Sequence, residues 1–183
     1  TVAQANALVS KYGASKVTDT TFDIADTAAN LVTLSAASIA EADAGLGDEI
    51  AMTGTATVSQ ALNINADSDA NGVGTFTIAA SRTLSSNGGV LSITSADIQI
   101  QGSTTSGTSK TVITVTNGRT LSLGATDLDF DLEGSELGKM TATGMEVGGT
   151  RCGSITINGI SDANSASISG TITIAASQDG SQI

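Results

Sequence analysis

The 183-residue chain contains no histidine, proline or tryptophan and only one cysteine. Without histidine it lacks the commonest general base and metal ligand, and a Ser-His-Asp triad is excluded. The single cysteine, Cys152, cannot form a disulfide within the chain. Cys152 is therefore a candidate intermolecular thiol or a buried residue, and we favour burial because free cysteine is among the most buried residue types.

Basic residues are also scarce, with 7 lysines and arginines against 18 acidic residues and a net charge of −11. Nucleic acids and anionic membrane surfaces are bound through lysine and arginine, so we expect neither as a partner. No stretch reaches the ~18 consecutive apolar residues of a membrane span, so we expect no membrane insertion. An acidic surface favours solubility and the binding of cations.

Aromatic residues make up only 2% of the chain, so its apolar residues are mostly alanine, valine, isoleucine and leucine. Such side chains suit thin, regular layers better than a bulky centre. The 21 glycines, with many asparagine, serine, threonine and aspartate residues, supply turns. The absence of proline is consistent with a continuous ladder that uses nearly every backbone N–H.

Degenerate internal repeats are the most informative feature that is present. The pattern Thr-aromatic/Ile-x-Ile-Ala occurs at 21–25, 75–79 and 171–175, and Arg-Thr-Leu-Ser occurs at 82–85 and 119–122. Repeats of this kind mark a solenoid, in which each coil buries its apolar side only by stacking on the next. A solenoid has a long surface and two exposed ends, so we expect a scaffold, adhesin or filament rather than an enzyme.

The coils are expected to change in character along a single solenoid of residues 1–183. Alternating apolar pairs at 22/24, 50/52 and 76/78 are each followed by a short segment with a leucine, which predicts coils of one strand and short helices over residues 1–74. Helical turns are expected at 26–31, with Asp26 as N-cap, at 57–62, more weakly at 81–84, and at 35–42.

Residues 75–183 are expected to form mainly β coils. The Asn-Gly pairs at 87–88 and 117–118 also suit hairpins of an antiparallel sandwich. We favour parallel coils because the repeats match in the same chain direction. The predicted strands are Thr75–Ile78, Val90–Thr94, Ile98–Ile100, Thr111–Thr116, Thr120–Leu123, Asp127–Leu132, Met140–Thr143, Ser154–Asn158 and Gly170–Ile174.

Two stretches resemble a known family. Residues 136–149 and 153–160 resemble the rungs of filamentous-haemagglutinin-type β-helix proteins. The segment 26–31, with its flanking Thr-Val-x-Gln-Ala copies, is similar to repeats of large bacterial surface proteins. The resemblance implies an all-β, right-handed parallel β-helix that is secreted or attached to the cell surface and serves in adhesion or as a stalk. The chain begins at Thr1 rather than methionine, and we expect it to be a piece of a larger protein.

The segment Asp67-Ser68-Asp69-Ala70-Asn71-Gly72 matches the first half of a calcium-binding loop. Asp67, Asp69 and Asn71 stand at alternate positions, where three oxygens can point at one ion, and a glycine follows for the tight turn. Position twelve is Ile78 rather than glutamate, so the segment is not an EF-hand. The alternative that we favour is a polar turn between coils, because these residue types populate turns without any ion.

Acidic residues alternate with apolar ones from Asp127 to Glu133. On a strand, Asp127, Asp129, Asp131 and Glu133 form an acidic ladder on one face, ~7 Å apart, while the apolar residues face the core. Paired carboxylates at such spacing also hydrolyse glycosidic bonds. The chain has few arginines and almost no aromatic residues to hold a sugar, so we favour a solvated acidic face that discourages edge aggregation.

Together these observations predict an extracellular structural or adhesive module that stacks end to end or edge to edge. Unpaired strand edges at the end of a solenoid are templates for pairing, so we expect self-association or continuation into the parent protein. No cofactor is required, although Ca²⁺ could bind at residues 67–71. The alternatives are a β-helix that binds or cleaves carbohydrate, with a glycan or host surface as ligand, and a calcium-stabilised surface module.

Overall fold

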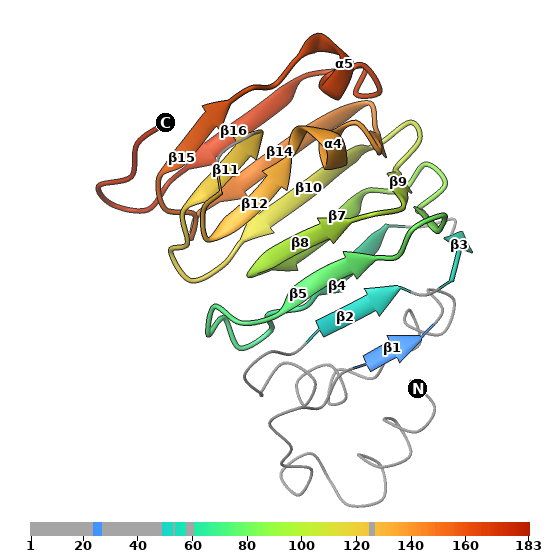
Figure 1. Cartoon of the computed structure of the whole chain (residues 1–183), viewed down its shortest axis with the longest axis horizontal. Coiled ribbons are helices and arrows are strands. Elements are labelled where there is room, and N and C mark those ends of the chain that lie inside the picture. The colour runs from blue at the N-terminus through green and yellow to red at the C-terminus, as the bar shows by residue number, and fades with distance from the viewer. Residues whose placement is uncertain (1–23, 27–48, 53, 58–60, 125–126) are drawn as a thin grey trace, which may run out of the picture.

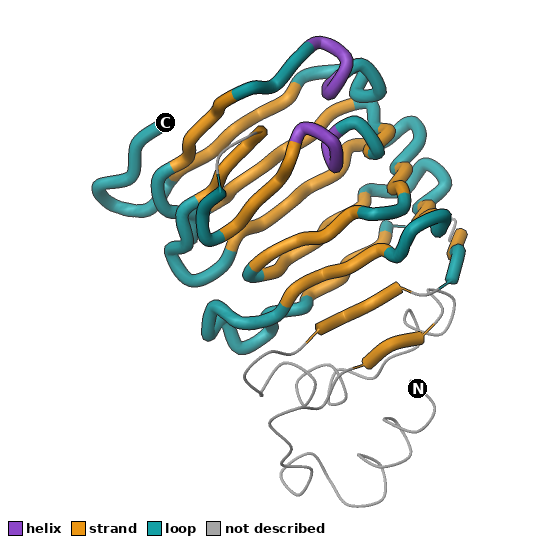
Figure 2. Tube along the Cα trace, viewed as in Figure 1, coloured by secondary structure: helices purple, strands orange, loops and turns teal. Residues whose placement is uncertain are grey.

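The computed structural model describes residues 24–26, 49–52, 54–57, 61–124 and 127–183 (Figure 1). This part of the chain is mostly β, with two four-residue helices (Figure 2). Neither of these helices has the length or the apolar character needed to cross a membrane. The elements are β1 (Ile24–Asp26), β2 (Glu49–Met52), β3 (Ala56–Thr57), β4 (Leu62–Asn65), β5 (Thr75–Ile78), β6 (Thr83–Ser85), β7 (Leu91–Ser95), β8 (Asp97–Ile100), β9 (Ser103–Thr105), β10 (Lys110–Val115), β11 (Leu121–Gly124), β12 (Phe130–Glu133), α4 (Gly134–Leu137), β13 (Met140–Thr141), β14 (Gly144–Gly149), β15 (Ile155–Asn158), α5 (Asp162–Ser165) and β16 (Ile172–Ala176).

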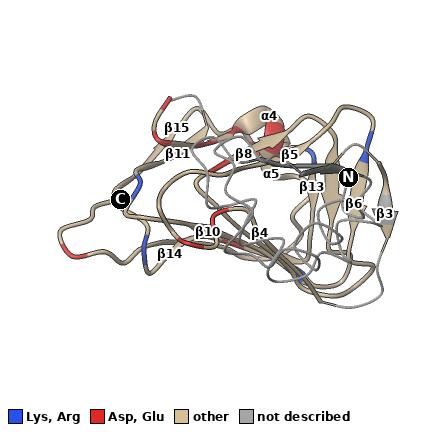
Figure 3. Ribbon diagram, turned by 90° about the horizontal axis from the view of Figure 1, so that it is seen from below, with Lys and Arg blue, Asp and Glu red and all other residues tan. Residues whose placement is uncertain are grey.

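All strand pairs within the described residues are parallel. The sheets run β1-β2-β5-β8, β3-β6-β9-β13, β4-β7-β10-β14-β16 and β12-β11-β15. From β5 to β10 consecutive strands lie in different sheets, so the chain visits three sheets in turn from β5 to β7 and again from β8 to β10. Seen along the stack, β4, β10 and β14 lie opposite β5, β8, β11 and β15, with β3, β6 and β13 on a third side (Figure 3). The predicted parallel pairing is therefore confirmed, and the antiparallel sandwich is wrong.

The Asn-Gly pairs form tight turns without forming hairpins. Asn87 and Gly88 have φ of 46° and 95°, and Asn117 and Gly118 have φ of 54° and 69°. Two successive positive φ values are typical of hairpin turns in antiparallel sheets. Here each turn instead joins strands of two different sheets, β6 to β7 and β10 to β11, so the local preference is kept while the chain turns a corner.

Strands stack in register along each sheet. Ile24 pairs with Ile50, and Ile50 pairs with Phe76, so β1, β2 and β5 follow one another at a repeat of 26 residues, although the apolar pairs at 22/24 and 50/52 are 28 residues apart in the sequence. Phe76 and Ile78 are fully buried, as alternation predicts for a strand with one face on the core. One inward column runs through five strands of the same sheet and consists of Ile64, Ile93, Ile113, Val147 and Ile174.

Short helices lie elsewhere than expected. The expected helical turns at 26–31 and 35–42 lie outside the described residues, except that Asp26 is the last residue of β1. The segments at 57–62 and 81–84 were predicted to be helical, but their described residues contribute to β3, β4 and β6. The two described helices fall within 75–183. Each begins with a capping box, Glu133 with Glu136 in α4 and Ser161 with Asn164 in α5, which satisfies the first backbone donors of a single turn.

Strand β12 lies out of sequence order. It follows β11 in the chain, yet it pairs with β11 on the side nearer to β8 (Figure 1). Side chains replace the backbone ladder between β8 and β12. Asp97 Oδ1 accepts a hydrogen bond from the Asp131 N–H (3.1 Å), and Glu136 Oε1 accepts one from the Ile100 N–H (2.7 Å). Lys139 Nζ donates to the Ile100 carbonyl at 2.9 Å, so this junction is a polar seam within one side of the stack.

Candidate functional site

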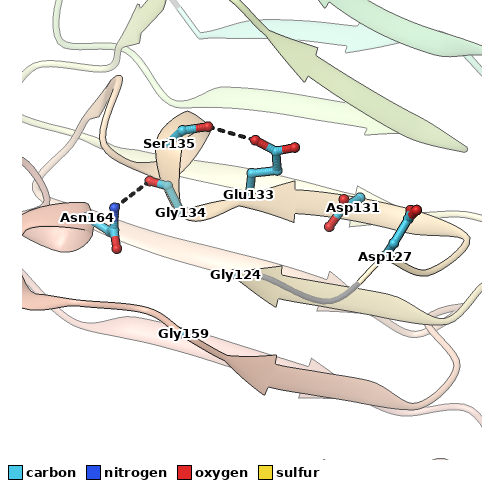
Figure 4. Close-up of a pocket in the computed structure, with 8 residues that line it drawn as sticks. All are labelled: Gly124, Asp127, Asp131, Glu133, Gly134, Ser135, Gly159 and Asn164. Carbon is cyan, nitrogen blue, oxygen red and sulfur yellow. Dashed lines mark hydrogen bonds between the residues drawn. The ribbon is translucent and has the colours of Figure 1, made fainter.

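A groove of about 520 Å³ opens over β12, the start of α4 and the loop after β15 (Figure 4). We call it the acidic groove. Carboxylates, a serine, an asparagine and three glycines line it, and no basic or aromatic residue is among them. The lining residues are Gly124, Asp127, Asp131, Glu133, Gly134, Ser135, Gly159 and Asn164.

The acidic groove contains three residues of the predicted acidic ladder, Asp127, Asp131 and Glu133. Phe130 and Leu132, which alternate with them, are fully buried, so the predicted division of faces is confirmed for β12. The predicted strand is three residues too long at its start, because β12 begins at Phe130. Asp127 therefore reaches the groove from the preceding loop.

Asp129, the fourth residue of the ladder, does not line the groove and instead accepts hydrogen bonds from Thr120. Its Oδ2 accepts hydrogen bonds from the backbone N–H (3.1 Å) and the hydroxyl (2.8 Å) of Thr120. These hydrogen bonds hold the pKa of Asp129 below its ordinary value, with a smaller contribution from Arg119. Arg119 also donates from Nε to the Asp129 carbonyl at 3.2 Å, so Asp129 fixes the approach of the chain to β12.

Glycines keep the groove open. Gly124 has φ of +120°, and a Cβ at this position would come within 1.9 Å of the Asn158 carbonyl oxygen. A Cβ on Gly134 would lie 3.0 Å from the side chain of Asn164. Any side chain at Gly124 would therefore force apart the backbones of β11 and β15, which pair along one side of the groove.

The polar side chains of the groove are held by short local bonds. Ser135 Oγ donates to Glu133 Oε2 at 2.8 Å, and Asn164 Nδ2 donates to the Gly134 carbonyl at 2.9 Å (Figure 4). Asp131 Oδ1 accepts a hydrogen bond from the hydroxyl of Ser122, which is fully buried. Asn164 thus connects α5 to α4. Hydrogen bonds hold the carboxylates of Asp131 and Glu133 in place, and Glu133 is exposed to solvent.

Two further carboxyl groups, Asp97 and Glu136, lie at the polar seam beside the groove. Burial raises the pKa of both, although hydrogen bonds from the Asp131 and Ile100 N–H groups oppose the shift. Sequence reasoning missed both. Glu136 carried a detectable signal, since it follows Glu133 at the three-residue spacing of a capping box, whereas Asp97 carried none because its partner comes from a distant coil.

The carboxylates of the acidic groove can accept hydrogen bonds from hydroxyl groups or bind cations. Paired carboxyls also serve in the hydrolysis of glycosidic bonds, where one of them is protonated. Asp97 and Glu136, whose pKa burial raises, lie at the polar seam and do not line the groove.

The predicted calcium loop forms a turn whose exposed oxygens bond within the turn. Asp69 Oδ1 accepts a hydrogen bond from the Asn71 N–H (3.0 Å), and Asp69 Oδ2 accepts one from Asn71 Nδ2 (2.9 Å). Asn71 Oδ1 accepts a hydrogen bond from the Val73 N–H at 2.7 Å. Within the described ranges, no group of three acidic or cysteine side chains is placed to hold a metal ion.

Asp67 points into the protein, away from the exposed Asp69 and Asn71. Its Oδ2 accepts hydrogen bonds from the Gly72 N–H (3.2 Å) and from the hydroxyl of Thr116, while its buried Oδ1 has no hydrogen-bond partner. Burial raises the pKa of Asp67, and the hydrogen bond from Thr116 is the largest opposing effect. The structure therefore places the three candidate ligands in a turn that is joined to a neighbouring coil.

Cys152 is fully buried, which confirms the preferred prediction. Burial raises the pKa of its thiol to about 11. Its carbonyl accepts hydrogen bonds from the Gln178 N–H and Ser181 Oγ, both at 3.4 Å, so the C-terminal segment packs across its backbone. Burial of Cys152 disfavours the alternative role of intermolecular thiol, which stays untested.

Comparison of the chain with protein-family models, with curated proteins and with solved structures found no match.

Proposed function

We propose that this chain is a right-handed parallel β-helix that serves as a structural or adhesive module at the cell surface and stacks at its end onto another coil. The observation that carries the proposal is the continuous parallel register. The column from Ile64 to Ile174 passes through five strands of one sheet without a slip. Right-handedness is supported by the strong preference for right-handed crossovers between parallel strands of one sheet, such as β5 and β8.

Parallel stacking explains how such a module would work. Each coil contributes strands to three sides, and the next coil covers its apolar residues and pairs with its backbone edges. Stability is then close to a sum over coils and their interfaces, and a stack of coils resists bending and extension along its axis. The uncovered edge of the last coil is the place where the stack can grow.

The extracellular location and the adhesive role rest on the resemblance of residues 136–149 and 153–160 to filamentous-haemagglutinin-type rungs. The composition agrees with this role, since a low content of charged residues (14%) and small polar residues on strand faces suit regular coils in a long surface protein. A catalytic role is not proposed, because the chain has no histidine and few arginine and aromatic residues to hold a sugar.

The acidic groove supports a second candidate function, the binding of a neutral glycan. Its volume of about 520 Å³ falls in the range of small-ligand sites, and its carboxylates can accept hydrogen bonds from sugar hydroxyls. A glycan array tests this function with Asp131→Asn and Glu133→Gln. The matched control is Asp162→Asn, which removes an exposed acid outside the groove. Binding that the groove substitutions leave unchanged would exclude the groove as the glycan site.

Electron microscopy and light scattering of the purified chain, with and without calcium, test the main proposal. We expect ordered end-to-end oligomers under both conditions, because the side-chain oxygens of Asp69 and Asn71 accept hydrogen bonds within the turn. A monodisperse monomer at every concentration would overturn the stacking role. Oligomers that form only with calcium would instead support a calcium-stabilised module.

A further inference from the structure

Three buried polar residues lie where β4, β7 and β10 end, on three successive coils. Asp67 follows β4 by two residues, Ser95 is the last residue of β7, and Thr116 is the first residue after β10. Asp67 is 1% exposed, Ser95 is fully buried and Thr116 is 3% exposed. We call these three residues the corner cluster. The corner cluster is separate from the acidic groove, whose lining begins at Gly124.

The fold brings the corner cluster together across one small residue. Extension of the register of β4, β7 and β10 by two residues places Asp67 and Thr116 at matching positions on either side of Ala96. Ala96 is buried and has only a methyl group, so the Asp67 carboxylate can reach past it to accept a hydrogen bond from the Thr116 hydroxyl. This hydroxyl also lies 3.3 Å from the Ser95 carbonyl oxygen, so the carboxylate lies beside the end of β7.

One oxygen of the Asp67 carboxylate is held by donors and the other is not. Oδ2 accepts hydrogen bonds from the Gly72 N–H (3.2 Å) and from the Thr116 hydroxyl. Oδ1 is buried without a hydrogen-bond partner, and the buried Ser95 Oγ has none either. Buried polar atoms are normally satisfied, so two unpartnered oxygens within one cluster point to a ligand between the coils.

The charge of Asp67 selects the kind of ligand. Within the described part of the chain the one ion pair joins Lys110 to Glu146, and no basic side chain meets Asp67. Buried carboxylates are normally paired with a cation or bound to a metal ion. Burial raises the pKa of Asp67, and a cation at Oδ1 would oppose that shift. A water molecule can satisfy the two free oxygens, but only a cation also compensates the charge.

We propose that the corner cluster binds a sodium ion between three coils, with Asp67 Oδ1 and Ser95 Oγ as its side-chain ligands. This site goes beyond the proposed stacking role, and it excludes the exposed Asp69 and Asn71. Its single carboxylate balances a monovalent ion, whereas calcium affinity depends on the number of charged ligands. Hard oxygen ligands suit such an ion, and the spacing of about 4.8 Å between coils suits sodium better than the larger potassium ion.

Thermal unfolding of the native chain, with sodium replaced by choline at constant ionic strength, tests the site. Choline is too large for a buried site, so it controls for screening. We expect the melting temperature to rise by about 3–6 °C between low sodium and about ten times the dissociation constant. Potassium should give less than half of this rise. A melting temperature that is the same in every salt would overturn the proposal, as would a rise that calcium produces and sodium does not.

Two variants and two matched controls locate the ion. Asp67→Asn removes the charge with little change of shape, and Ser95→Ala removes the hydroxyl ligand alone. Asp69→Asn makes the same change at an exposed position of the turn, and Ser92→Ala makes it on the outward side of β7. The sodium-dependent rise should fall to less than a third in both variants and persist in both controls.

Sodium NMR relaxation gives a second readout that does not depend on unfolding. Exchange of sodium with a protein site should broaden its signal in the native chain and in the controls, and the broadening should be lost in Asp67→Asn and Ser95→Ala. Broadening and a sodium-dependent melting temperature that persist in both variants would place the ion elsewhere and overturn the proposal. An Asp67→Asn variant that is more stable than the native chain even at high sodium would show a proton rather than an ion on Asp67, and would also overturn it.

Discussion

Replacement of Glu136 tests the polar seam between β8 and β12. The two carboxylate oxygens of Glu136 accept hydrogen bonds from the Ile100 N–H (2.7 Å) and the Glu133 N–H (3.0 Å), and the side chain is buried. Glu136→Ala leaves both donors without these partners, at about 1–3 kcal/mol for each. The substitution also removes the free-energy cost of burying a carboxylate, which offsets part of this loss. We therefore expect a net destabilisation of about 2–4 kcal/mol. Glu136→Gln keeps one acceptor and should cost about 1 kcal/mol.

Urea unfolding followed by circular dichroism at pH 7 measures both losses. The matched control is Glu133→Gln, because Glu133 is exposed and glutamine keeps a side-chain oxygen for Ser135 and for the capping box of α4. We expect the control to change the free energy of unfolding by less than about 0.5 kcal/mol. A Glu136→Ala variant as stable as the native chain would refute the role of this side chain as the link between β8 and β12.

The same substitution has a signature in pH. Burial raises the pKa of Glu136, so its contribution to folding is complete below the pKa of the unfolded chain and is lost as pH rises through the folded pKa. Asp67 and Asp97 have pKa values shifted in the same direction. The native chain should therefore gain stability as pH falls from 7 to 5, and Glu136→Gln should gain less. An equal gain in both would contradict the assignment to Glu136.

Three further predictions concern other parts of the chain. Gly124→Ala should destabilise the protein by at least about 2 kcal/mol in the same urea assay, because Gly124 has a positive φ and the new Cβ would clash with the Asn158 carbonyl oxygen. The control Gly138→Ala should be neutral, because Gly138 has φ of −64° and its Cβ would lie 3.5 Å from the nearest atom, the Gly134 carbonyl oxygen. Cys152 should react with a thiol reagent at pH 7.5 only after unfolding, since the thiol is buried and its pKa is about 11; rapid reaction of the folded chain would contradict the described packing. Removal of calcium with a chelator should leave the melting temperature unchanged, because hydrogen bonds hold the turn at 67–72. A fall of several degrees would instead support calcium binding by this turn.

Much of the strand pattern could be predicted from the sequence. Alternation of apolar and polar residues located β5 at its observed bounds and placed β7, β8, β10, β11 and β15 within one residue at each end. Alternation succeeds in such strands because one face is buried, and the burial of every second residue is what the pattern records. The same-direction repeats also identified parallel pairing against the local preference of the Asn-Gly pairs for hairpins.

Strands with small polar residues could not be found in this way. β9 is Ser103-Thr104-Thr105, and only Thr104 is buried. Such a strand has no apolar alternation, so no strand is predicted there. Its conformation is imposed by pairing with β6 and β13, which come from the coils on either side. The information lies in the neighbours rather than in the segment.

The candidate site was predicted in its residue types but not in its arrangement. The acidic ladder located Asp131 and Glu133, because alternation fixes the face of each residue once a strand is given. Sequence spacing could not show that Asn164 of α5 and Gly159 would complete the groove. These residues belong to the next coil. Their position beside Glu133 depends on the placement of β12 between β8 and β11, which no local sequence pattern predicts.

The out-of-order position of β12 bears on how the chain reaches its folded state. In a regular array each new coil docks on the one made before it. β11 differs, because its two paired strands, β12 and β15, both follow it in the chain. During synthesis of the chain, β11 has no partner strand until residues 130–133 (β12) are made. Its second edge stays unpaired until residues 155–158 (β15) are made. The coils from β11 to β15 therefore form one cooperative unit, and a cut between residues 124 and 155 removes more than the coil it interrupts.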